Sequence, residues 1–368
     1  MSAAPLHLIR PEVRAERPYV VATEADVPAK LDQNEAPWDT PADVKEAATR
    51  RLLASDWNRY PPDRPHQLQA ALADRLGLST SSVLVGHGSN EIAHTIGLAF
   101  FDAGTPVVLP HPMFALYESV ARMHGARVVP VDPGPRFGHS ADDILSAAVE
   151  SNAPLTIVTT PNNPTGQVIP FEDIERLASG VPGFLLVDEA YFEFVEGPTA
   201  VALIDRYPNV LSIRTFSKAM GLAGLRVGYL VADPAVIVEI EKARLPFVVD
   251  AFAESVALAL LERPSMVAER VATLKAERDR LLVALEARGD VEVIPGAANF
   301  FLMRAAPAPS GLVAGLAGHG VRVRSMAPYR ALGPDEPGMG WVRVSVGSPA
   351  ENRAFEVALH EVLAQVIA

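Results

Sequence analysis

Residues 211–228 read LSIRTFSKAMGLAGLRVG and join a short apolar strand to a run of small residues. Lys218 stands in this run among apolar or small neighbours. A lysine at the end of a buried strand lies where α/β proteins bind ligands. Burial favours its neutral amine, which is the nucleophile that condenses with a carbonyl group. The other four lysines of the chain lie in the N-terminal stretch or among charged helical residues: Lys30, Lys45, Lys242 and Lys275.

Short apolar runs alternate with amphipathic segments on both sides of this stretch, from about residue 66 onward. Runs of Val, Ile and Leu bounded by Gly, Pro, Asp or Asn indicate strands buried on both faces. We therefore expect an α/β fold, with a mainly parallel sheet sandwiched by helices. The predicted strands are residues 83–85, 106–109, 128–131, 155–159, 184–187, 211–213 and 227–231.

The predicted organisation has three parts. Residues 1–40 show little periodicity and are expected to form an arm that packs on the small domain or on a partner subunit. Residues 41–263 form the large domain, and residues 264–368 form a smaller α+β domain. The smaller domain is expected to start with a long charged helix and to contain strands near residues 300–303, 321–324 and 341–346.

Composition excludes several classes of function. The formal charge of -12 over 368 residues argues against a nucleic-acid surface, which needs a basic footprint. The absence of cysteine excludes disulfides, thiolate metal sites and cysteine nucleophiles. No stretch approaches the roughly 20 apolar residues of a membrane span, and no signal-peptide pattern precedes residue 20. We expect a cytoplasmic protein with no metal site and no membrane partner.

Three further polar segments follow predicted strands. They are Thr160-Pro-Asn-Asn-Pro-Thr-Gly166, Val187-Asp-Glu-Ala-Tyr191 and Gly86-His-Gly-Ser-Asn-Glu91. Alone, each has an ordinary interpretation: a Pro-Gly turn, a helix cap and a common strand-to-helix turn. In the last segment, backbone N–H groups and a helix N-terminus can also hold an anion.

Taken in order, these segments resemble the fold-type I aminotransferases that depend on pyridoxal phosphate (PLP). The resemblance covers essentially the whole chain and is closest to histidinol-phosphate aminotransferases and their aromatic-aminotransferase relatives. It implies that Lys218 carries PLP as a Schiff base and acts as catalytic acid and base. It also implies that Asp188 pairs with the pyridinium nitrogen, while Asn163 and Tyr191 donate hydrogen bonds to the 3′-oxygen.

The resemblance assigns further cofactor contacts. Phe114 stands where these relatives usually have a tyrosine stacked on the pyridine ring, so its contact lacks a hydroxyl. Tyr60 resembles the residue that reaches the cofactor phosphate of the neighbouring subunit, which implies a homodimer with shared active sites. The implied phosphate cradle consists of Ser89, Asn90, Glu91, Thr215, Ser217 and Arg226.

On the substrate side, Arg343 in Trp341-Val-Arg-Val-Ser-Val-Gly347 matches the arginine that binds the substrate's carboxylate or phosphate. Arg324 is a second candidate. Asn34 resembles an N-terminal substrate-side motif, although Ala36 replaces an asparagine that is common in that motif.

The resemblance therefore implies ping-pong transamination between a small amino donor and a 2-oxo acid, with histidinol phosphate and 2-oxoglutarate as the expected pair. An aromatic amino-acid aminotransferase would keep the same catalytic residues. A threonine-phosphate decarboxylase shares the scaffold. The effector-sensing domain of a transcription regulator would need a DNA-binding module, for which the residues before 41 leave no room.

Overall fold

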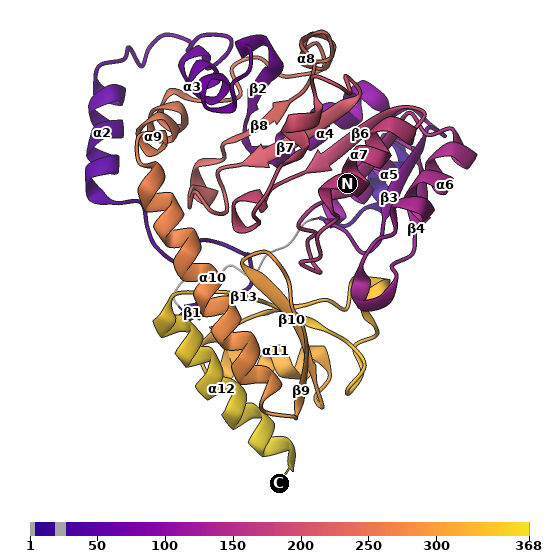
Figure 1. Cartoon of the computed structure of the whole chain (residues 1–368), viewed down its shortest axis with the longest axis vertical. Helices are drawn as coiled ribbons and strands as arrows, with labels where there is room; N and C mark the ends of the chain where they lie inside the picture. The colour runs from indigo at the N-terminus through magenta and orange to yellow at the C-terminus, as the bar shows by residue number, and fades with distance from the viewer. Residues whose placement is uncertain (1–3, 19–26, 368) are drawn as a thin grey trace.

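The computed structural model describes residues 4–18 and 27–367, which form two sheets in separate parts of the molecule (Figure 1). The larger sheet has the order β2-β8-β7-β6-β5-β3-β4, and every neighbouring pair is parallel except those of β8. This confirms the expected α/β fold; the apolar pattern did not distinguish the antiparallel strand. The strands are β2 (Val83–Gly86), β3 (Pro106–Pro110), β4 (Arg127–Val131), β5 (Leu155–Thr159), β6 (Phe184–Asp188), β7 (Val210–Thr215) and β8 (Gly228–Val231).

Helices cover both faces of this sheet, because its strands alternate their apolar side chains between two hydrophobic clusters. On β2, Leu84 packs with one cluster, whereas Val83 and Val85 pack with the other. The first face is covered by α4 (Gly88–Phe100), α5 (Ala115–Met123) and α8 (Pro234–Glu241). The opposite face is covered by α6 (Ala141–Ser151) and α7 (Phe171–Gly180).

A long helix, α10 (Pro264–Glu286), connects the part of the molecule that contains the large sheet with the part that contains the smaller sheet (Figure 1). It starts with proline at its first position, which costs no helical hydrogen bond. It follows a group of three helices, in which the last packs against the other two and the second also contacts β2. These are α2 (Ala42–Leu53), α3 (His66–Leu76) and α9 (Ala251–Leu261).

The smaller sheet is antiparallel with the order β12-β13-β10-β9 and is flanked by helices, as expected for an α+β unit. The expected strand near residues 321–324 divides into two, because β11 pairs with the arm strand β1 while β12 joins the four-stranded sheet. The elements are β1 (Ala29–Lys30), β9 (Val291–Ile294), β10 (Phe300–Ala305), α11 (Pro309–Gly318), β11 (Val321–Arg322), β12 (Arg324–Ser325), β13 (Val342–Ser345) and α12 (Pro349–Ile367).

The described parts of the N-terminal arm contact both halves of the molecule. Residues 29–30 extend the small domain's structure through β1, whereas α1 (Pro11–Ala15) lies against α5, where Arg10 donates to the carbonyl of Met123. The contact with α5 was not part of the sequence expectation. Short 3₁₀ helices cover Leu6–Leu8, Thr80–Ser82, Pro135–Phe137, Phe192–Phe194 (η4), Ala200–Leu203, Ala223–Leu225 and Arg330–Leu332.

Candidate active site

The carboxyl ends of β5, β6 and β7 bring the polar segments of the sequence to one edge of the large sheet. Parallel strands end on the same edge, so residues far apart in sequence meet there. Asp188 is the last residue of β6 and Thr215 is the last residue of β7. The loop that carries Asn163 leaves β5 beside them, since Thr160 donates its backbone N–H to the carbonyl of Asp188 at 2.9 Å.

Lys218 lies just beyond β7 and is partly buried. Its Nζ donates to the carbonyl of Gln33 at 2.9 Å and lies 5.8 Å from the centre of the Tyr191 ring. Burial, with the nearby charge of Arg343 as the next cause, lowers the pKa of Lys218 to about 7. A substantial fraction of this amine is therefore neutral near pH 7 and able to act as a nucleophile or base.

Asp188 is a buried carboxylate that faces only neutral hydrogen-bond donors. Its Oδ2 accepts the hydroxyl of Tyr117 at 2.7 Å, and its Oδ1 accepts the N–H of Ala190 at 3.0 Å. Burial raises the pKa of Asp188 to about 6, although both hydrogen bonds oppose the shift. Among the described residues, no ion pair involves Asp188. A cationic group from a ligand would therefore stabilise its ionised form.

Four of the six predicted cradle residues gather around the N-terminus of α4. Arg226 donates to the hydroxyl of Ser217 at 3.3 Å, and the hydroxyls of Ser217 and Thr215 lie 2.9 Å apart. A Cβ on Gly88 would lie 2.5 Å from the Arg226 guanidinium, and one on Gly228 would lie 2.5 Å from the backbone nitrogen of Ser89. Glycine at both positions thus lets the guanidinium and the strand approach the helix N-terminus, and the cluster can hold an anion.

The other two predicted cradle residues are placed differently. The Glu91 carboxylate turns back on its own helix, where it accepts the N–H of His87 at 3.1 Å and the hydroxyl of Thr95 at 2.8 Å. This geometry caps α4, so the side chain of Glu91 is not an anion ligand, and an acid there would repel a phosphate. Asn90 is exposed on the first turn of α4.

The two predicted aromatic contacts, Phe114 and Tyr60, differ in burial. Phe114 precedes α5, is partly buried and lies edge-on to Tyr117, the donor to Asp188, at 6.4 Å between ring centres. Tyr60 is 84% exposed and stacks on Phe247, with 4.9 Å between the ring centres.

The two predicted substrate arginines are register partners in the small sheet. Arg324 on β12 lies opposite Arg343 on β13, so both side chains leave the same face of the sheet. Arg343 is buried and donates to the Asn163 side-chain oxygen and to the carbonyl of Asp32 at 2.7 Å. Its contact with Asn163 joins the small sheet to the loop after β5.

Asn34 connects the arm to the site and is itself fully buried. Its Nδ2 donates to the hydroxyl of Tyr191 at 3.0 Å, and its Oδ1 accepts from Ser345 at 2.8 Å. Burial raises the pKa of Tyr191 to about 12, so its hydroxyl stays protonated at neutral pH. The side chain of Asn34 therefore holds Tyr191 in place rather than pointing to open space.

Sequence reasoning missed Tyr117. Its signal is weak, because a tyrosine three residues after Phe114 on an apolar helix face also fits an ordinary core position. Only the tertiary arrangement shows that its hydroxyl meets a carboxylate 71 residues away. The described residues contain no cluster of three or more His, Asp or Glu side chains that could hold a metal. None of the described helices has the length and apolar character needed to cross a bilayer.

Comparison with known proteins identifies the family of the chain. Residues 28–359 match the profile of aminotransferase class I and II. The chain is 36% identical to a histidinol-phosphate aminotransferase of Chlorobium luteolum, over 94% of this chain and 95% of that one. The corresponding enzyme of Chlorobaculum tepidum is also 36% identical, over 94% and 97% of the two chains.

A solved structure resembles the whole chain. The histidinol-phosphate aminotransferase of Sinorhizobium meliloti, in complex with pyridoxal-5′-phosphate, matches with a TM-score of 0.87 and 27% identity over 99% of both chains. Fold and site together define an aminotransferase. The chain belongs to the aminotransferase class I and II family, and the expectation of a PLP-dependent enzyme is confirmed.

Proposed function

We propose that the chain is a histidinol-phosphate aminotransferase that works as a homodimer and passes the amino group to 2-oxoglutarate. The observation that carries the choice of substrate is the pairing of Arg324 with Arg343 on one face of the small sheet. A phosphate monoester carries up to two negative charges, whereas a carboxylate carries one. Two guanidiniums therefore match the charge of a phosphate better than that of a carboxylate. The relatives named above support the same assignment.

The residues of the site fit PLP. Asp188 is a buried acid without a cationic partner among the described residues, which suits a protonated ring nitrogen. The cluster of Ser89, Ser217 and Arg226 suits a phosphate, and Lys218 suits an aldehyde carbon. We assign Asn163 and Tyr191 to the 3′-oxygen and Phe114 to the ring face. The cofactor, when bound, supplies the electron sink that makes the substrate Cα acidic.

The chain's own residues then divide the work. Nζ of Lys218 accepts the proton from the substrate Cα and later returns a proton, which its pKa of about 7 permits near neutral pH. Asp188 keeps the ring nitrogen protonated. The guanidinium of Arg343, held by Asn163 and Asp32, orients the anionic end of the substrate.

The substrate assignment is tested by comparing kcat/KM for histidinol phosphate and phenylalanine with 2-oxoglutarate as the common acceptor. We expect histidinol phosphate to be preferred, and Arg324→Ala to reduce that preference at least tenfold, or about 1.4 kcal/mol. A preference for phenylalanine that Arg324→Ala leaves unchanged would identify an aromatic amino-acid aminotransferase instead. Release of carbon dioxide from threonine phosphate would identify the decarboxylase.

The homodimer is supported by an exposed apolar surface around the Tyr60–Phe247 stack. Large apolar side chains in two segments that meet at this stack are exposed: Leu53, Trp57, Tyr60, Leu245 and Phe247. Burying such a surface against a second copy would stabilise the dimer and bring Tyr60 to the partner's cradle.

Complementation tests this arrangement. Mixed dimers of a Tyr60→Ala subunit and an Arg226→Ala subunit should regain one intact phosphate site, and activity should exceed that of either variant alone. A fully active monomer in sedimentation experiments would refute the proposal of shared sites.

A further inference from the structure

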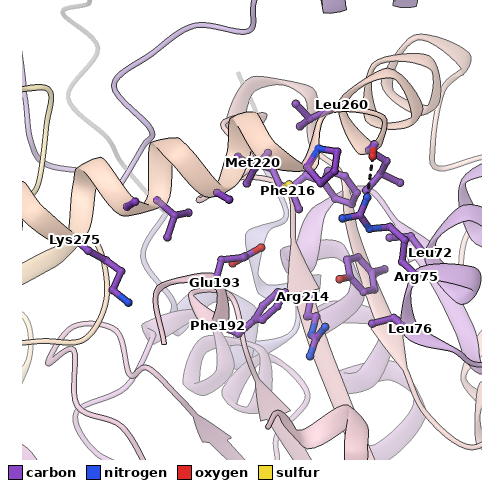
Figure 2. Close-up of a pocket in the computed structure, with 17 residues that line it drawn as sticks. Leu72, Arg75, Leu76, Phe192, Glu193, Arg214, Phe216, Met220, Leu260 and Lys275 are labelled. Carbon is purple, nitrogen blue, oxygen red and sulfur yellow. Dashed lines mark hydrogen bonds between the residues drawn. The ribbon is translucent and has the colours of Figure 1, made fainter. Parts of the chain in front are cut away.

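A second cavity, of about 480 Å³ and separate from the catalytic site, lies against the lysine segment, whose Phe216 and Met220 line it (Figure 2). It is bounded by helices α3, α9 and α10 on one side and by η4, β7 and β8 on the other. Its walls are largely apolar and include Leu72, Leu260, Val267, Val271, Phe216 and Met220. This size and lining are typical of sites that bind a small molecule.

Among the described residues, Glu193 is the only acid that lines this cavity, and its side chain points into it in Figure 2. Its Oε2 is buried and has no hydrogen-bond partner among the described residues, and no ion pair of those residues involves it. Burial raises the pKa of Glu193 to about 8. The ionised carboxylate is therefore costly in the free protein and would gain from a cation.

The cations of the cavity wall already have their own acceptors. Arg214 pairs with Glu189 at 2.9 Å, and Lys275 pairs with Glu196 at 3.0 Å. Arg75, at the rim, donates to the carbonyl of Leu261 at 2.8 Å. Arg75 is exposed, so its charge faces solvent. Once ionised, Glu193 is therefore the charge of the cavity wall that has no ion-pair partner among the described residues.

We propose that this cavity binds a small protonated amine with an apolar body, whose nitrogen pairs with Glu193. The body would fill the space between α10 and the side chains of Phe216 and Met220. These two residues stand on either side of Lys218 in the chain, so an occupied cavity would contact the back of the catalytic segment without entering the catalytic site.

The proposal is tested by calorimetric titration of the holoenzyme with N,N-dimethyl-2-phenylethylamine, a tertiary amine that cannot condense with an aldehyde. With about eleven heavy atoms, this probe should bind with a Kd on the order of 1 mM or lower. Glu193→Gln should weaken binding at least tenfold, because it removes the charge and keeps the shape. Glu292→Gln, the same charge change at an exposed pair with Arg304, should leave the Kd within about twofold.

A second variant separates this cavity from the catalytic site. Ala272 is exposed on α10 and lines the cavity, so Ala272→Trp should fill it, abolish the heat of binding and leave turnover intact. Binding that survives Ala272→Trp, or that Glu193→Gln leaves unchanged, would overturn the proposal. So would tighter binding of the anionic analogue 3-phenylpropionate, or no saturable binding of the amine up to roughly 10 mM.

Discussion

The two faces of the large sheet differ sharply at the end of β6, where two acids follow each other. Glu189 turns to the face with the second cavity and accepts hydrogen bonds from Arg214, from Ser212 at 2.6 Å and from the N–H of Ala200 at 2.8 Å. Asp188 turns to the catalytic face and accepts only neutral donors. Glu189 is thus paired with a cation of the protein itself, whereas Asp188 can pair with a cationic group of a ligand.

This difference separates structural from catalytic charge. The buried ion pair of Glu189 and Arg214 holds β6 and β7 together, and both oxygens of its carboxylate already accept hydrogen bonds from the protein, so it cannot bind a ligand. A buried acid without a cation costs stability until a ligand supplies the charge. The four predictions below act on these two faces, in order of expected effect.

The largest effect is expected on the catalytic face, from Lys218→Ala. Loss of the amine removes both the point of cofactor attachment and the proton carrier, so kcat should fall by at least about 10⁴-fold. The melting temperature should change little, since the side chain makes one hydrogen bond, to Gln33. Borohydride reduction of the wild-type holoenzyme and peptide mapping should place the label on residue 218.

The matched control is Lys242→Ala, which removes an exposed lysine paired with Glu239 and should keep full activity. A reductive label on any lysine other than Lys218 would contradict the assignment.

The second effect is expected on the opposite face, from Glu189→Gln. Arg214 would remain buried without a counter-charge, and breaking such a pair costs about 3–5 kcal/mol in the free energy of unfolding. Urea denaturation measures this loss. The exposed pair of Glu292 and Arg304 provides the control, because Glu292→Gln should cost at most about 1 kcal/mol. Equal losses in the two variants would mean that the pair with Arg214 does not hold the strands.

The third effect returns to the catalytic face, with Asp188→Asn. The amide keeps the shape but loses the charge that holds the ring nitrogen protonated, so kcat should fall about 10²-fold, or about 2.7 kcal/mol. Unfolding should change far less than in Glu189→Gln. If kcat stays within about tenfold of the wild type, Asp188 serves only as the acceptor for Tyr117 and Ala190.

The strand-end residues of the catalytic face could be predicted from the sequence because each follows an apolar run, and parallel strands bring such ends together. The cradle residues Ser217 and Arg226 were expected only from the resemblance to the family, because the pattern of strands does not single out Arg226. The role of Glu91 could not be predicted in this way. Its carboxylate caps the N-terminus of α4 instead of contacting the phosphate, and this depends on the geometry of that helix. Tyr117 and the pair of Glu189 with Arg214 depend on which helix covers which face, and local pattern does not carry that information.

The smallest effect is expected from Tyr117→Phe. The hydroxyl of Tyr117 donates to Asp188 at 2.7 Å and lowers the pKa of that carboxyl, which burial raises to about 6. Without the hydroxyl the pKa of Asp188 should rise further, by about one unit. Asp188 is ionised above its pKa, so cofactor affinity should fall as the pH drops through this pKa. We call this fall the acid limb, and in Tyr117→Phe it should move to higher pH. Titration of the apoenzyme with cofactor at a series of pH values measures this limb.

The control for this last prediction is Tyr207→Phe. Tyr207 donates to Glu175 at 3.3 Å, far from the ends of β6 and β7 that hold the site, and its loss should leave the acid limb in place. In Asp188→Asn the contribution of this carboxyl to the limb should disappear. If Tyr117→Phe lowers stability but leaves the limb unmoved, Tyr117 only fills the core. A shift in Tyr117→Phe alone would show that a neutral hydroxyl helps to keep the carboxyl of Asp188 ionised.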